Sequence, residues 1–218
     1  MIRGYEMKMP ELLAPVGGKA HLTAAVNNGA DAVYMGGMAF NARIFADNFS
    51  DDELPEAIRY AHIHGVRVYI TLNTLVRDDE LVRAFEYANY LYGIGVDGLI
   101  VQDMGLARVI RKYIPDMPLH LSTQGTLYNR EAVRLAKELG FCRVVPAREL
   151  TLEEIREVVR EGTAVSPDDP VEVEVFVHGA LCMCYSGQCQ MSRMMGRGSG
   201  RTGNRGTCAQ PCRQPYTD

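Results

Sequence analysis

A short pattern recurs four times along this sequence and constrains its fold more than any other feature. Each copy is a glycine followed by an apolar stretch, and the copies are G-A-D-A-V-Y at Gly29, G-V-R-V-Y-I at Gly65, G-V-D-G-L-I at Gly95 and G-F-C-R-V-V at Gly140. Glycine commonly ends a helix, so each copy indicates a helix end followed by a strand. The copies recur at roughly 30 residues, the size of a βαβ unit. We therefore predict a parallel sheet covered by helices.

Apolar stretches and helical spacing extend this pattern to seven strands and six helices. The expected strands are Glu11–Pro15, Ala32–Met35, Val66–Leu72, Gly98–Val101, Leu119–Leu121, Arg143–Val145 and Val171–Val177. The expected helices are Lys19–Asn28, one from an N-cap at Ser50 to His64, Asp78–Tyr92, Met104–Tyr113, Asn129–Leu139, and one capped by Thr151. Such alternation predicts a TIM-like (β/α) barrel, which has eight strands in about 250 residues. The chain stops about one βα unit short, so we expect either an irregular barrel or part of a longer protein.

We expect one domain with two parts. Residues 1–177 form the barrel, and residues 178–218, called the cysteine segment below, lie at its mouth. The start of the chain has no apolar run typical of a signal peptide, and no stretch is long enough for a membrane helix. We therefore predict a cytoplasmic protein without a membrane partner. Disulfides are rare in that compartment, and clustered cysteines there more often bind metal or do chemistry.

The cysteine segment contains five of the six cysteines: Cys182, Cys184, Cys189, Cys208 and Cys212. Four thiolates can hold structural zinc or an iron–sulfur cluster. The gap between Cys182 and Cys189 is too wide for a zinc knuckle, which favours iron–sulfur over zinc, with a metal-free thiol site as a third option.

The same segment is cationic. Residues 175–217 contain no Asp or Glu but include Arg193, Arg197, Arg201, Arg205 and Arg213. Arginines lower thiol pKa values, and they pair bidentately with phosphate or carboxylate. We therefore expect the segment to meet an anionic ligand, although a solvated arginine-rich loop is the simpler alternative.

Polar residues follow most of the predicted strands at the end where barrel enzymes place their sites. They are Tyr34, Asn41, Arg43, Asn73, Gln102, Asp103, Ser122, Gln124, Arg148, Glu149 and His178. From this rim we select Tyr34, Arg43, Asn73, Gln124, Glu149 and His178 as catalytic candidates. His178 and Cys184 also permit a Cys/His protease hypothesis, but no third orienting group is evident and the G-x-S-x-G elbow is missing.

Several motifs together resemble one known family. H-G-A-L-C-M-C-Y-S-G-Q-C at His178 and N-R-G-T-C-A-Q-P-C-R at Asn204 look like the signature of the collagenase-like peptidase U32 family. Matching motifs in the same order are E-L-L-A-P-V-G at Glu11, G-A-D-A-V-Y at Gly29, L-H-L-S-T-Q at Leu119 and R-E-L-T-L-E-E-I at Arg148. The resemblance spans nearly the whole chain. The chain departs from the usual family pattern at Cys184, Gln188 and Gln214.

The resemblance implies a function that composition and spacing do not reach. The family is named for collagen-degrading activity, whereas its better understood members are oxygen-independent hydroxylases of a tRNA uridine, a ribosomal RNA cytidine or a ubiquinone precursor. It implies a four-iron cluster ([4Fe–4S]) with Cys182, Cys189 and Cys208 as ligands. The fourth ligand is Cys212 or a residue beyond this chain. It also implies prephenate as a hydroxyl source.

From residues and resemblance together we predict an iron–sulfur-dependent hydroxylase of an RNA base. Arg193, Arg205 and Arg213 are expected to hold phosphates of the tRNA or rRNA or carboxylates of the donor. Two alternatives stay open at this point. One is an endopeptidase acting on collagen-like peptides, and the other is a non-catalytic cluster-bearing subunit that needs a partner chain to supply a missing C-terminal part.

Overall fold

The computed structural model describes residues 9–42, 44, 46–179, 181–195 and 202–216. Its seven strands form one parallel sheet in chain order. They are β1 (Leu13–Pro15), β2 (Ala32–Met35), β3 (Arg67–Leu72), β4 (Gly98–Val101), β5 (Leu119–Leu121), β6 (Phe141–Val144) and β7 (Glu172–Val173). The predicted strand number, direction and barrel-like class are confirmed.

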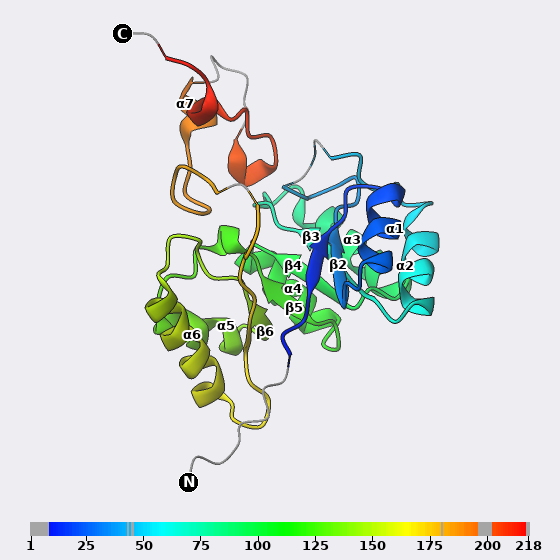
Figure 1. Cartoon of the computed structure of the whole chain (residues 1–218), viewed down its shortest axis with the longest axis horizontal. Helices are drawn as coiled ribbons and strands as arrows, with labels where there is room; N and C mark the ends of the chain where they lie inside the picture. Colours follow the sequence, from blue (N-terminus) through cyan, green and yellow to red (C-terminus); the bar gives the residue numbers. More distant parts are fainter. Residues whose placement is uncertain (1–8, 43, 45, 180, 196–201, 217–218) are drawn as a thin grey trace.

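Six helices connect the strands and cover the outer face of the sheet (Figure 1). They are α1 (Lys19–Asn27), α2 (Leu54–Ile63), α3 (Leu81–Gly93), α4 (Met104–Tyr113), α5 (Arg130–Glu138) and α6 (Leu152–Val165). The four repeated glycines, which follow α1, α2, α3 and α5, all have φ between 75° and 86°, as a left-handed helix end requires. The Thr151 hydroxyl and Glu154 form the capping box that starts α6.

The hydrophobic core lies between the outer face of the sheet and these helices. Its central side chains are completely buried. They include Val33, Val68 and Leu99 on the strands and Leu91 and Leu106 on the helices. This layer is the main apolar contribution to folding, because burying one such side chain stabilises the fold by about 1.5–3 kcal/mol. The helices therefore fix the position of every strand end.

The inner face of the sheet carries charged as well as apolar side chains, unlike the outer face. Contacts across this face show that the sheet curls. A small apolar cluster of Ala32, Tyr69 and Ile100 lies there. Beside it the Arg143 Nη1 on β6 donates to Glu11 Oε1, just before β1, at 2.7 Å. This ion pair joins the two ends of the sheet across the interior. No strand pairing joins β1 to β7 among the described residues, so the barrel is open.

Two element boundaries differ from the predictions. Strand β7 has two residues instead of the seven expected over Val171–Val177. Glu174 N still donates to Val144 O at 2.9 Å, but the next donor on that side of β6 would be Pro146, which lacks an N–H. Ser50 does not cap α2 directly. Its N–H and hydroxyl bond to the Glu53 carboxylate in a turn that precedes the helix.

The cysteine segment stands over the end of the sheet at which the strands finish (Figure 1). It holds one short helix, α7 (Met191–Met195), and two 3-10 turns, η2 (Gly203–Arg205) and η3 (Pro211–Arg213); a third such turn, η1 (Thr123–Gly125), lies in the barrel. None of the helices in the described part of the chain is long and apolar enough to cross a bilayer.

Candidate active site at the barrel mouth

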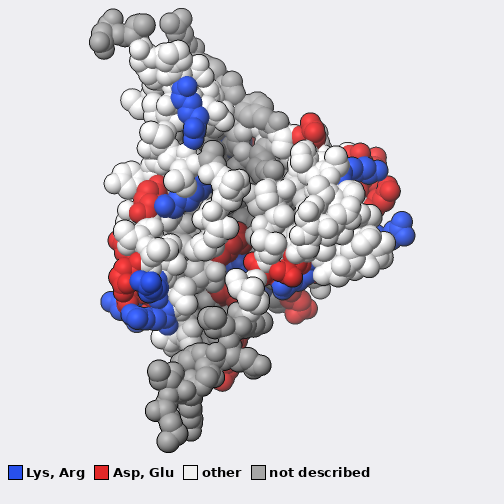
Figure 2. Space-filling view, viewed as in Figure 1, with Lys and Arg blue, Asp and Glu red and all other residues white. Residues whose placement is uncertain are grey.

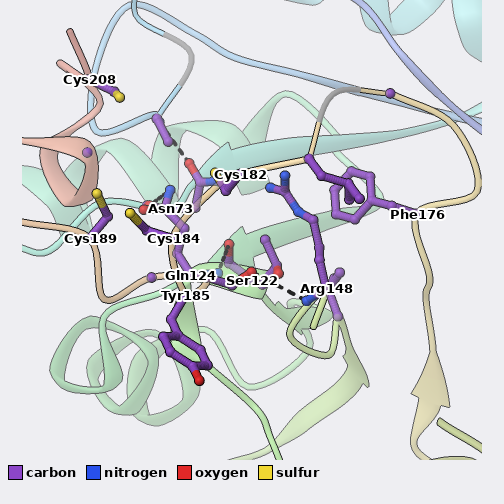
Figure 3. A pocket seen from close by; sticks show the side chains of 18 of the residues that line it. Asn73, Ser122, Gln124, Arg148, Phe176, Cys182, Cys184, Tyr185, Cys189 and Cys208 are labelled. Carbon is purple, nitrogen blue, oxygen red and sulfur yellow. Dashed lines mark hydrogen bonds between the residues drawn. The ribbon is translucent and has the colours of Figure 1, made fainter. Parts of the chain in front are cut away.

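A cavity of about 660 Å³ lies between the strand ends and the cysteine segment. Barrel residues Tyr34, Asn73, Ser122, Gln124 and Arg148 form part of its wall, and the five segment cysteines also line it. Figure 3 shows four of these barrel residues, Asn73, Ser122, Gln124 and Arg148, opposite four of the cysteines. Its volume is within the range of small-molecule sites, about 300–1,000 Å³. The two parts of the chain therefore build one site, as the strand count predicted.

Hydrogen bonds from the barrel rim hold the segment in place. The Thr126 hydroxyl donates to Ser186 O at 2.8 Å, and Gln188 Nε2 donates to that hydroxyl at 2.9 Å. Ser186 N donates to Glu149 Oε1 at 2.5 Å. Leu75 N donates to Asn204 O at 3.2 Å. These bonds fix the cavity wall on two sides.

Two glycines let the segment's backbone approach the barrel closely. Gly187 has φ of 76° and Gly206 has φ of 77°, a region that other residues rarely adopt. A Cβ on Gly187 would overlap the carbonyl oxygen of Gln124, and one on Gly206 would overlap that of Asn41. In both cases the added Cβ would meet a backbone carbonyl oxygen, so moving a side chain could not relieve the overlap.

The thiols gather on the segment's side of the cavity. Figure 3 shows Cys184 and Cys189 beside each other, with Cys182 and Cys208 farther around the wall. The pKa of Cys184 is raised, mainly by its interaction with the Cys189 thiol and next by burial. The thiols of Cys212 and Cys182 add to the effect. Cys184 Sγ lies 3.3 Å from Met191 Sδ. None of the six cysteines forms a disulfide among the described residues.

This donor set suits a soft metal or an iron–sulfur cluster, because the ligands available are thiols and residues 178–217 contain no Asp or Glu. The described side chains do not bring three or more potential ligands to metal-binding distance of one point. Cys182, Cys189, Cys208 and Cys212 share one cavity. The chemistry of the set therefore fits a cluster, and which four residues hold it stays a prediction.

The structure describes five of the six predicted catalytic residues, and four of these line the cavity. Tyr34, Asn73, Gln124 and His178 all line the cavity. Asn73 Oδ1 accepts from Ala42 N at 2.9 Å, so the Asn73 amide holds the loop after β2. Gln124 Nε2 donates to Asn73 O at 3.2 Å, so the Gln124 amide holds the loop after β3. Glu149 instead holds the segment through Ser186, and Arg43 lies outside the described residues.

The predicted anion-binding arginines lie outside this cavity. Arg205 forms a two-pronged ion pair with Glu80, with both N–O distances at 2.7 Å, and it lowers the pKa of that carboxyl to about 2. Arg213 Nη2 donates to Leu181 O at 2.5 Å. Arg193 is exposed on α7. On the face shown in Figure 2, a basic side chain is visible on the uppermost lobe, and basic and acidic side chains lie close together below it.

Two further residues belong to the site. Arg148 lines the cavity with its guanidinium 4.7 Å from the centre of the Phe176 ring, as Figure 3 shows. Glu174 also lines the cavity and was missing from the candidates. The alternation of Val and Glu over Val171–Glu174 was the available signal, since alternate residues of a strand face the same side.

Comparison with known proteins identifies the family. The model of peptidase family U32 matches residues 17–218. The chain belongs to peptidase family U32. A solved U32 peptidase superposes with a TM-score of 0.61 at 18% identity, covering 79% of this chain and 70% of that one, which supports the fold alone.

Two curated relatives are named for RNA hydroxylation. The 23S rRNA 5-hydroxycytidine synthase of Escherichia coli is 43% identical over 207 residues, covering 95% of this chain and 30% of that protein. The tRNA hydroxylation protein P1 of Bacillus subtilis is 40% identical over 209 residues, covering 96% of this chain and 47% of that protein. The chain thus spans about a third to a half of the length of these relatives.

Proposed function

We propose that this chain carries the catalytic site of an RNA hydroxylase that acts on a base of tRNA or rRNA. The observation that carries the proposal is that five thiols, several amides and several aromatic rings line one cavity at the barrel mouth. Support comes from relatives at 40–43% identity that are named for hydroxylation of tRNA and rRNA.

The cavity offers suitable contacts for a base. RNA-modifying proteins hold unstacked bases on aromatic rings or guanidinium planes and bond to their edges. Tyr34, Phe176 and Tyr185 supply rings in the cavity wall, and Arg148 supplies a guanidinium beside Phe176. The amides of Asn73 and Gln124 can bond to a base edge. The cationic segment around them favours approach of the RNA backbone.

Cys182, Cys189, Cys208 and Cys212 would hold a [4Fe–4S] cluster in this proposal. Such a cluster supplies electron transfer at the cavity wall when it is bound. In this proposal the cluster would act on a bound base together with a small hydroxyl donor, for which prephenate is the proposed identity. Arg148 is the cation in the cavity wall that suits a carboxylate of such a donor.

A cysteine pair in this chain allows a matched test. Cys182→Ser removes a proposed ligand, whereas Cys142→Ser removes a thiol on β6 that bonds to Leu119 O and does not line the cavity. After anaerobic purification we expect wild type and Cys142→Ser to contain about four iron atoms per chain. We expect Cys182→Ser to lose most of the iron and at least 100-fold of the rate at which hydroxylated nucleoside forms, measured by mass spectrometry.

The two parts of the proposal fail separately. An iron-free wild-type protein that still forms hydroxylated nucleoside would refute the cluster and keep the RNA hydroxylation. Unchanged nucleosides in RNA from cells with and without the gene would refute the RNA substrate.

A further inference from the structure

Glu174 lines the cavity from the first position after β7. Its backbone N–H bonds to Val144 O at 2.9 Å, which fixes it against β6. Its side chain lines the cavity and is only 16% exposed. A carboxyl group in this position lies between the polar interior of the barrel and any ligand bound above it.

The interior does not provide Glu174 with a full partner. Arg143 Nη1 bonds to Glu11 at 2.7 Å, and its Nε and Nη2 bond to Glu172 at 2.9 and 2.5 Å. Glu174 Oε2 is 3.8 Å from Arg143 Nη1, too far for a hydrogen bond. This oxygen is buried and has no hydrogen-bond partner among the described residues. One arginine is therefore shared by three carboxylates, and Glu174 receives the weakest contact.

Burial and two neighbouring charges set the protonation state of Glu174. The charged groups that act on it are Arg143 on β6 and Glu11 before β1. Both of these also contact Tyr69 on β3, whose ring lies against His120 on β5. Burial, then the Glu11 carboxylate, raises the pKa of Glu174 to about 7, and Arg143 only partly opposes this. Burial lowers the pKa of His120 to about 3 and raises the pKa of Tyr69 to about 12, so both stay neutral.

We propose that Glu174 is the proton donor of the cavity, giving its carboxyl proton to a carbonyl oxygen or ring nitrogen of the bound base. The O–H bond of the carboxyl breaks as a new O–H or N–H bond forms on the base. The negative charge then left on Glu174 lies 3.8 Å from Arg143. This inference rests on the proposed function, because the acceptor is a base of the RNA substrate.

The first test compares two glutamates that share Arg143. Glu174→Gln keeps the shape of the side chain but has no proton to transfer, and we expect the hydroxylation rate to fall about 100-fold or more, with KM for RNA changed by less than about threefold. The wild-type rate should decline as pH rises through about 7, and this limb should be missing from the variant. Glu172→Gln is the control, since Glu172 is 61% exposed and does not line the cavity. It should keep the rate at low pH, with the limb displaced to lower pH because Glu172 no longer competes for Arg143.

A Glu174→Gln variant with the wild-type rate and an unchanged alkaline limb would overturn the inference. Should that variant fail to fold, Glu174→Asp takes its place. It keeps a carboxyl proton but withdraws it by one methylene, so we expect a loss of rate with a displaced limb. An unchanged profile would count against Glu174.

A second readout does not need catalysis. The infrared carbonyl band of a protonated carboxyl, taken as the difference between wild type and Glu174→Gln, reports the Glu174 proton directly with and without an RNA oligonucleotide. We expect the band to disappear near pH 7 and to shift when the RNA binds. If wild type forms no hydroxylated nucleoside but the band behaves this way, the proposed reaction fails and Glu174 as donor to a bound base survives. If the band shows that Glu174 is ionised at every pH from about 5 to 9, the donor role is overturned.

Discussion

The barrel and the cysteine segment keep their shapes by different means. In the described part of the chain, every buried hydrophobic residue lies at or before Val171. Within the cysteine segment the buried polar residues are Ser186, Ser192 and Asn204, and the large hydrophobic residues Leu181, Met183, Tyr185 and Met194 are exposed. The barrel is therefore stabilised mainly by apolar burial, and the segment by polar contacts with the barrel rim.

This difference separates folding from site formation. A barrel with its own core can fold whether or not anything binds at its mouth. A segment held by a few polar contacts opens at low free-energy cost, and a ligand bound by its thiols would stabilise the closed form. We therefore expect substitutions in the barrel to change global stability, and substitutions in the segment to change local opening.

The largest expected effect comes from the barrel core. Leu99→Ala on β4 removes a fully buried side chain and should lower the free energy of unfolding by about 2–5 kcal/mol. Leu181→Ala removes the same atoms from a residue that is 59% exposed in the segment, and should change it by less than about 0.5 kcal/mol. Urea denaturation measures both. Equal losses in the two variants would break the contrast between the regions.

Glu174, at the junction of the two regions, should make stability depend on pH. Its pKa rises from 4.5 when unfolded to about 7 when folded, so the folded state holds the proton more tightly. This contribution is complete below about pH 4.5 and is lost as pH rises through about 7, at a cost of up to about 3 kcal/mol. The free energy of unfolding, measured by urea denaturation from pH 4 to 8, should show this decline in wild type and in Glu172→Gln. A decline of the same size in Glu174→Gln would assign it to another group.

The smallest expected effect is local to the segment. Arg205→Gln breaks the ion pair to Glu80 and the bond to Leu75 O, and should weaken docking of η2 by about 1 kcal/mol. Hydrogen exchange should then accelerate around residues 202–207 while the urea midpoint stays unchanged. Arg193→Gln, on exposed α7, is the control and should leave exchange at η2 as in wild type. A shifted midpoint in Arg205→Gln would mean that the segment and barrel unfold together.

The sequence predicted the barrel well because its signals are local. Glycine-led helix ends and short apolar stretches specify strands without knowledge of their neighbours, and all seven strands were located. The length of β7 was missed because it depends on Pro146, which follows the adjacent strand β6, rather than on its own residues.

The site was predicted less completely, because its contacts join distant parts of the chain. The rim residues Tyr34, Asn73, Gln124 and His178 follow from strand ends, and they do line the cavity. The pairing of Arg205 with Glu80 spans 125 residues, and no local pattern reveals it. Glu174 was hidden for a similar reason, since only the folded interior shows that Arg143 is already occupied by other carboxylates.

The close approaches at Gly187 and Gly206 limit how portable the cysteine segment is. Each glycine lies against one particular backbone carbonyl of the barrel, that of Gln124 or that of Asn41. A recipient scaffold would need two carbonyl groups in the same places, not merely a barrel mouth of similar width. The segment therefore cannot be moved to another barrel by itself. A chimera that exchanges it must also include the loops around Asn41 and Gln124.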